Sequence, residues 1–186
     1  MKKICAQASF VSSADPEAIY SLVKNSATYP FWSMIDEFEL VRPGKDGPHG
    51  VGSQRIFRTS RLVMHEEVVE LVPNRLTAYT LLSGFPMNEY RAETLLDPIE
   101  GGGTKITWRC SFYPKYRGSG WLWRLVMSNV FRRLVRGVAR ASEDREQRLE
   151  FLAAANDKAT SKRTLDARKG ARGHRHRCDP PSATLL

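Results

Sequence analysis

The feature that most constrains this fold is a long amphipathic helical pattern from Trp121 to Phe151, which follows a region typical of antiparallel strands. Its apolar residues recur every three or four positions, while Arg132, Arg136 and Arg140 form a basic edge about half a turn away. An uninterrupted helix of this length measures roughly 45 Å at ~1.5 Å per residue, so it can span a sheet from end to end. One long helix over a sheet predicts a cavity between them.

The region before this helix predicts a meander of strands and two short helices. Asp15 followed by Pro16 is a typical helix start and predicts a short helix to about Asn25, with a second short helix or turn at 29–34. Turn residues separate the expected strands, which are 3–12, 38–42, 52–59, 62–72, 76–83, 89–97 and 105–112. This order predicts an α+β domain with its helices on one face of the sheet.

The last two expected strands alternate most clearly. On 89–97 the even positions are apolar or small and the odd ones mostly charged, and the same pattern returns after the turn at Gly101–Gly103. One face of each strand is therefore dry and carries aromatic residues, namely Tyr90, Trp108 and Phe112. These side chains either pack the core or line a pocket.

Length and charge predict one domain followed by a tail. The chain has 186 residues and a formal net charge of +9, and eight Lys/Arg but only three Asp lie after Asn156. Residues 157–186 contain few large apolar side chains, so they cannot bury enough area to offset the entropy of ordering. We expect a folded domain at 1–156 and a disordered basic tail at 157–186.

The cysteines and the first residues indicate the compartment. Cys5, Cys110 and Cys178 lie far apart and suggest no disulfide framework, so a reducing environment is expected. No apolar segment follows Met1–Lys3 as a secretory signal requires, and no uncharged apolar run reaches about 18 residues. We expect a soluble, cytoplasmic protein.

Short motifs in a fixed order resemble the SRPBCC superfamily (START-like, helix-grip fold), most closely its polyketide cyclase/dehydrase branch. The resemblance spans about residues 3–155. The motifs are Ala14–Glu17, Tyr29–Trp32, Gly52–Arg55, Glu66–Val69, Pro73–Leu76, Ser83–Gly84 and Gly102–Trp108. The resemblance implies a curved seven-stranded antiparallel sheet that wraps around the long C-terminal helix. It also implies a largely apolar cavity for lipids, polyketides, hormones or other hydrophobic molecules, and it does not by itself imply catalysis.

We therefore expect the protein to bind a hydrophobic small molecule in a cavity of roughly 300–1,000 Å³ between the sheet and the helix. Tyr79 and Tyr90 are the first ligand contacts to test, because a buried hydroxyl requires a partner. The full set of expected ligand-binding residues is Trp32, Arg55, Glu67, Tyr79, Tyr90, Trp108, Phe112, Met127, Phe131 and Leu134.

Two readings of Glu67 stay open. It forms a structural ion pair with Arg55, since the family pattern places an Arg and a Glu in these adjoining strands, or it acts with His65 as a proton-transfer pair. The second reading makes the protein a cyclase or dehydrase with Glu67 or His65 as catalytic acid/base. Cys110 lies between apolar neighbours and is expected to be an inert thiol.

The tail offers a third class of function. Its basic charge predicts weak contact with nucleic acid or an anionic membrane, and the protein would then be a regulatory module. His174, His176 and Cys178 have zinc-binding atoms but lack a fourth ligand, so no metal site and no cofactor are expected. The sequence leaves the ligand and the oligomeric state open.

Overall fold

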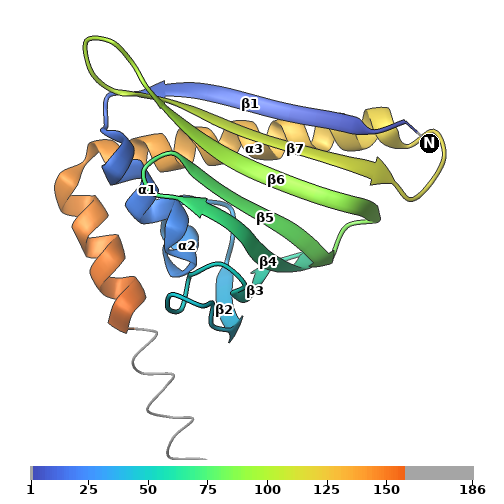
Figure 1. Cartoon of the computed structure of the whole chain (residues 1–186), viewed down its shortest axis with the longest axis horizontal. Coiled ribbons are helices and arrows are strands. Elements are labelled where there is room, and N and C mark those ends of the chain that lie inside the picture. Colours follow the sequence, from blue (N-terminus) through green and yellow to red (C-terminus); the bar gives the residue numbers. More distant parts are fainter. Residues whose placement is uncertain (1, 158–186) are drawn as a thin grey trace, which may run out of the picture.

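The computed structural model describes residues 2–157 and shows one antiparallel sheet of seven strands. The strands are β1 Ile4–Ser12, β2 Glu37–Arg42, β3 Gln54–Thr59, β4 Leu62–Val72, β5 Leu76–Ser83, β6 Met87–Pro98 and β7 Thr104–Pro114. Their order in the sheet is β1-β7-β6-β5-β4-β3-β2, so β2 to β7 form a meander and the N-terminal strand β1 pairs with β7 at one edge (Figure 1). This confirms the predicted seven-stranded sheet.

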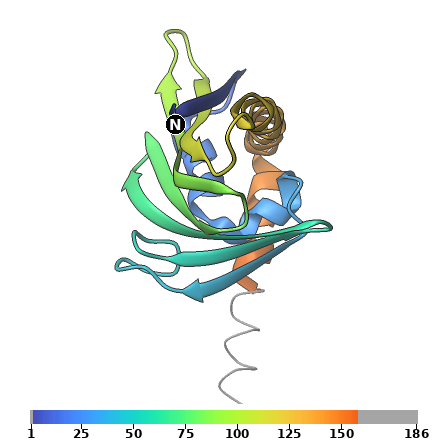
Figure 2. The ribbon, with the colours of Figure 1, turned by 90° about the vertical axis from the view of Figure 1, so that its right-hand side faces the viewer.

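The helices lie on the concave side of the sheet. Between β1 and β2 the chain forms α1 (Pro16–Lys24), a 3-10 turn at Ser26–Thr28 and α2 (Tyr29–Trp32), and after β7 it forms α3 (Gly120–Glu143). Figure 2 shows the sheet curving around the helices, with α3 seen nearly along its axis. The predicted helix-grip fold is thus confirmed.

The long helix is interrupted, contrary to the sequence prediction. α3 ends at Glu143, Asp144 adopts an extended conformation, and residues 145–157 form a second helix that turns away from α3 (Figure 1). The Asp144 carboxylate accepts a hydrogen bond of 3.0 Å from the Gln147 amide and so caps the new helix. The apolar spacing continues across the break because the second helix also packs on the domain, with Phe151 stacked on Phe31 at 5.3 Å.

The core fills the space between α3 and the concave face. Trp108 and Phe112 of β7 are fully buried, and Phe131, Val135 and Val138 of α3 are 0–1% exposed. The ring of Trp108 stacks on that of Phe131 with centroids 6.3 Å apart, which fixes the concave face as the one that carries Trp108. Among residues 2–157 no helix is long and apolar enough to cross a membrane. The predicted tail, apart from Asp157, and its candidate zinc ligands lie outside the described residues.

Candidate functional site

A charged pair lies on the concave face of the sheet, in the interior between the sheet and the helices, which we call the grip. Arg55 on β3 is directly opposite Glu66 on β4, and its Nη2 lies 3.0 Å from the Glu66 carboxylate, with Nε 3.1 Å from the same oxygen. Only 3% of the Arg55 side chain and 8% of the Glu66 side chain are exposed. Each charge stabilises the other in this buried position, because either one alone would be strongly destabilising there.

The predicted pairing of Arg55 with Glu67 is wrong by one residue. Glu67 is opposite Gln54, and its carboxylate accepts hydrogen bonds from Gln54 (2.7 Å) and Arg42 (3.3 Å) on the other face of the sheet. Neighbouring residues of a strand point to opposite faces, so only Glu66 can share a face with Arg55.

Three aromatic rings and one hydroxyl complete the surroundings of Arg55. Its guanidinium carbon lies 5.6 Å from the ring centroid of Tyr29, 4.9 Å from that of Phe57 and 5.0 Å from that of Tyr79. Its Nη1 donates to the hydroxyl of Ser26 at 2.7 Å. The cation is therefore stabilised by ring faces as well as by Glu66.

Burial governs the protonation of this cluster. It raises the pKa of Glu66, and the attraction and hydrogen bond of Arg55 offset that rise only in part, so this carboxyl takes up a proton more readily than an exposed glutamate. Burial lowers the pKa of Arg55, but Glu66 and the tyrosines more than compensate, and the guanidinium stays charged. Burial raises the pKa of Tyr29 to about 12, so its phenol stays neutral.

An aromatic layer continues from this cluster towards α3. Trp108 Nε1 donates to the Tyr79 hydroxyl at 3.1 Å, and the ring centroid of Tyr90 lies 6.4 Å from those of both Tyr79 and Phe112. The structure thus gathers eight of the ten expected ligand-binding residues in one core cluster. Of the other two, Arg55 contacts this cluster and Glu67 lies on the other face of the sheet. The eight members are Trp32, Tyr79, Tyr90, Trp108, Phe112, Met127, Phe131 and Leu134, and none is more than 9% exposed. In this structure they pack against one another, so a ligand must displace some of them.

Sequence reasoning missed one polar atom of this interior. Thr94 on β6 is opposite Trp108 and therefore points to the concave face, where it is fully buried. Its hydroxyl oxygen has no hydrogen-bond partner among the described residues. Such a buried hydroxyl is costly unless something binds it. In the sequence it is one small polar residue in an alternating strand, which no pattern distinguishes from a packing residue.

The two predicted catalytic candidates do not form a pair. His65 is opposite Ile56, and its Nε2 is buried with no hydrogen-bond partner in the described part of the chain, while Glu67 is bonded to Gln54 and Arg42. Cys110 is buried on β7, and burial raises the pKa of its thiol to about 12, so it is a poor nucleophile.

One end of the interior is closed by adaptable side chains. Phe85, in the β5–β6 loop, meets Trp123 of α3 edge to face at 5.7 Å, and Met87 and Met127 belong to the same core cluster. Methionine side chains fill irregular space and change conformation at low cost.

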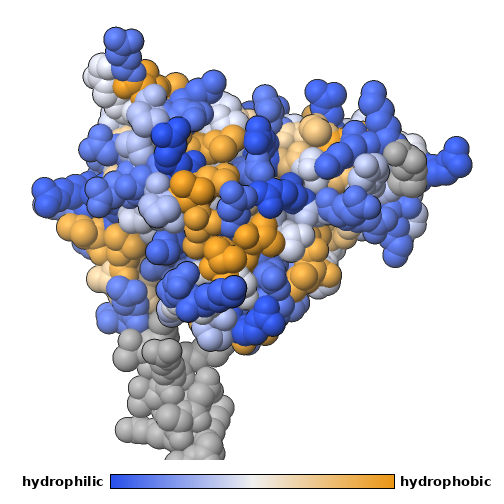
Figure 3. Space-filling view, viewed as in Figure 1, coloured by the Kyte–Doolittle hydropathy of each residue, from blue (hydrophilic) through white to orange (hydrophobic). Residues whose placement is uncertain are grey.

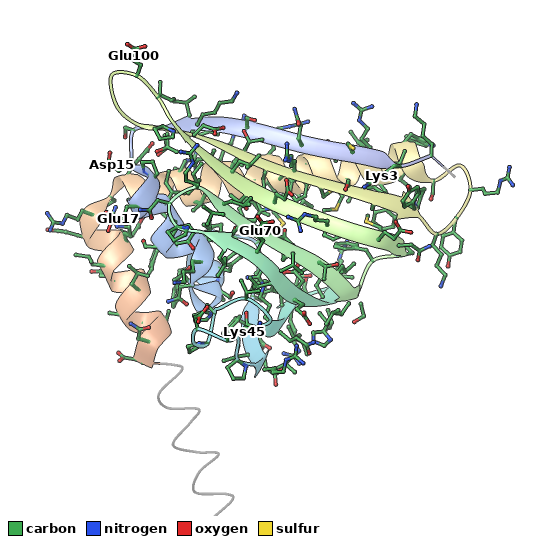
Figure 4. All side chains as sticks on the ribbon, in the orientation of Figure 1. Lys3, Asp15, Glu17, Lys45, Glu70 and Glu100 are labelled. Atoms are coloured by element: carbon green, nitrogen blue, oxygen red, sulfur yellow. The ribbon has the colours of Figure 1, made fainter. Side chains whose placement is uncertain are left out.

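The outer face of the sheet is polar. Arg91 bridges Glu70 (2.6 Å) and Glu93 (2.8 Å), and Arg109 joins Glu93 at 2.6 Å. Glu70 lies over the middle of this face in Figure 4, and Figure 3 shows hydrophilic side chains spread across it with hydrophobic patches between them. A shallow hollow of about 350 Å³ beside this network is lined by Cys5, Ala6, Gln7, Arg91, Glu93, Arg109, Cys110 and Ser111. Exposed pairs of this kind contribute little to stability, and the apolar interior remains the better candidate site.

Comparison with solved structures defines the class. The fold matches a START superfamily protein from Mycobacterium smegmatis (TM-score 0.65, 16% identity, 75% of this chain and 97% of the other). It also matches Zhui aromatase/cyclase from a Streptomyces species (TM-score 0.65, 11% identity, 76% and 94%). A third match is norcoclaurine synthase from Thalictrum flavum, a point mutant in complex with a transition-state analogue (TM-score 0.62, 11% identity, 76% and 94%). At these identities the likeness establishes the START-like helix-grip fold.

The family follows from the sequence itself. Residues 3–146 match the family described as polyketide cyclase / dehydrase and lipid transport, and the chain belongs to that family. The search of curated proteins gave no match. The resemblance inferred from the short motifs is thus confirmed, and the fold and family fit a ligand-binding protein.

Proposed function

We propose that this protein binds a hydrophobic small molecule, of the lipid or polyketide kind, between the concave face of the sheet and α3. The observation that carries the proposal is the buried Arg55–Glu66 pair within an otherwise aromatic and aliphatic interior. A core that serves packing alone gains nothing from two buried charges, whereas a ligand site needs a few fixed polar groups among apolar walls.

The arrangement suggests how the ligand lies. Its apolar body replaces the side chains of Met87 and Met127 at the end closed by Phe85 and Trp123. A polar group of the ligand, such as a carbonyl or a phenol, then reaches the Thr94 hydroxyl, which has no partner within residues 2–157, near the Trp108–Tyr79 hydrogen bond. A ligand carboxylate that reaches further would compete with Glu66 for Arg55, which is favoured when Glu66 is protonated.

The direct test is native mass spectrometry of the full chain purified without detergent. We expect a bound hydrophobic compound that leaves the protein on denaturation and is recovered by solvent extraction. Thr94→Val keeps the side-chain volume and removes the hydroxyl, so it should lower the bound fraction. Thr107→Val makes the same change on β7, on the outer face of the sheet, and serves as the control. The absence of any bound compound, together with no binding of added fatty acids or aromatic polyketides, would refute the proposal.

A second candidate is an enzyme of the cyclase or dehydrase kind. The observation that favours it is a carboxyl group inside the grip with a raised pKa, which suits a general acid or base. Glu66 takes this role in place of the predicted Glu67 and His65. A poly-β-keto thioester incubated with the wild-type protein should undergo intramolecular aldol addition, and the resulting β-hydroxy ketone should then lose water. Glu66→Gln should abolish turnover but keep binding, and turnover that survives this change would exclude Glu66.

A further inference from the structure

The first two turns of α3 carry large apolar side chains on the side that faces solvent. Trp121 is 72% exposed, Leu122 45% and Leu125 52%, and Tyr116 in the preceding loop is 60% exposed. At 100° per residue, positions 121, 122 and 125 fall within one 100° arc of the helix. We call Tyr116, Trp121, Leu122 and Leu125 the apolar tip. A cluster of this kind on a surface marks an interaction site.

The apolar tip lies among cations. Lys2 and Arg117 border a hollow of about 410 Å³, whose other lining residues are Ile4, Pro114, Gly118, Gly120 and Trp121. Lys3 lies near this end of the molecule, where α3 begins (Figure 4). Lys115 precedes the tip in sequence and Arg124 lies between Leu122 and Leu125, and residues 101–142 contain no Asp or Glu. No acidic residue of this segment therefore neutralises the cations around the tip.

The basic character continues along the same side of α3. Arg132, Arg133, Arg136 and Arg140 are all exposed, and none of them forms an ion pair with a described acidic residue. An exposed apolar cluster beside a row of arginines combines the two contributions that bind a protein to an anionic membrane surface, which are buried apolar area and electrostatic attraction. Indole and leucine side chains enter the acyl boundary, while guanidinium groups remain at the lipid phosphates.

We propose that the apolar tip and the arginine side of α3 dock the protein on a bilayer that contains anionic lipids. Lys2 and Arg117 hold a lipid phosphate at the hollow, and the tip inserts beside it. Nucleic acid would also attract the arginines, but it would leave Leu122 and Leu125 exposed to water with no partner. The leucines therefore favour a membrane. The proposal does not depend on ligand binding, although Trp123, which covers one end of the interior, lies within the same turn.

Vesicle co-sedimentation of the full chain tests the proposal, with phosphatidylcholine alone and with phosphatidylcholine that contains phosphatidylglycerol. We expect binding to the anionic vesicles only. The variant Leu122→Ser/Leu125→Ser should weaken it about tenfold or more, because the inserted apolar area is lost. The control Val63→Ser/Leu82→Ser removes side chains of similar exposure, 52% and 46%, from β4 and β5 and should bind like wild type.

The charges need a separate pair of variants. Arg117→Gln/Arg124→Gln should weaken binding and reduce its salt dependence, whereas Arg61→Gln/Arg75→Gln, at exposed turns, should do so much less. Thermal unfolding of each variant identifies any loss due to misfolding. The proposal is overturned if wild type does not sediment with anionic vesicles, or if the leucine variant and its control bind equally. It is also overturned if Leu122→Ser/Leu125→Ser loses binding to RNA but keeps binding to anionic vesicles.

Discussion

Arg55 and Glu66 face each other across β3 and β4 inside the grip, with 3.0 Å between guanidinium nitrogen and carboxylate oxygen and almost no exposure to water. The adjacent Glu67 points the other way and forms a half-exposed pair with Arg42. Two neighbouring glutamates thus experience opposite environments, and each provides a control for the other.

Glu66→Ala should destabilise the domain by about 3–5 kcal/mol, because Arg55 is left buried without its partner. Glu67→Ala should cost less than about 1 kcal/mol, since exposed pairs are screened by water. Urea unfolding of both variants measures the difference. The double variant Arg55→Met/Glu66→Leu should recover much of the loss. Equal effects of the two alanine variants would show that the pair is not buried in solution.

Thr94→Val should leave the free protein as stable as wild type or slightly more stable, because it removes a buried hydroxyl that has no partner among the described residues. Chemical unfolding of the ligand-free protein checks this. A loss of more than about 1 kcal/mol would mean that a water or a bound compound satisfies the hydroxyl.

His49 should contribute to the loss of stability at low pH. Burial, with Arg55 and Lys24 nearby, lowers its pKa from 6.5 to about 4. Between these values the unfolded chain binds a proton that the folded chain does not, so stability should fall as pH drops from 6.5 towards 4. Urea midpoints of wild type and His49→Gln at about pH 7.5 and about pH 5 isolate this contribution. The wild type should lose more than the variant, and an equal loss would contradict the assignment.

The break at Asp144 makes a local prediction. Asp144→Ala removes the cap on the Gln147 amide and should cost about 0.5–2 kcal/mol, whereas Glu146→Ala, two residues further along the chain, should be nearly neutral. Thermal unfolding compares the two. If both variants unfold at the wild-type temperature, the second helix does not contribute to the stability of the domain.

Turn chemistry made most of the fold predictable. Pro73, Asn74 and Arg75 place β4 and β5 at the predicted limits, and Asn74 adopts a positive φ of 61°, which asparagine tolerates at a tight reversal. Likewise Asp15 and Pro16 placed the start of α1 correctly. These signals are local, so no knowledge of tertiary contacts was needed to interpret them.

The site was less predictable because strand alternation loses its phase at a bulge. An irregularity between Val68 and Glu70 inserts one residue, so Glu66 and Leu71 share the concave face although their positions differ by an odd number. Counting back from Leu71 in steps of two therefore selects Glu67 instead of Glu66. The helix break at Asp144 was missed for a similar reason, since apolar spacing continued through it.

The most direct test of ligand binding in the grip is a titration followed by methyl NMR of the methionines. Labelled methionine gives separate signals for Met87 and Met127, inside the core cluster, and for Met34, outside it. With decanoate or 2-naphthol as the probe, we predict saturable shifts of the Met87 and Met127 signals and none for Met34. If the Met87 and Met127 signals stay unchanged up to the solubility limit of both probes, the grip does not bind hydrophobic small molecules.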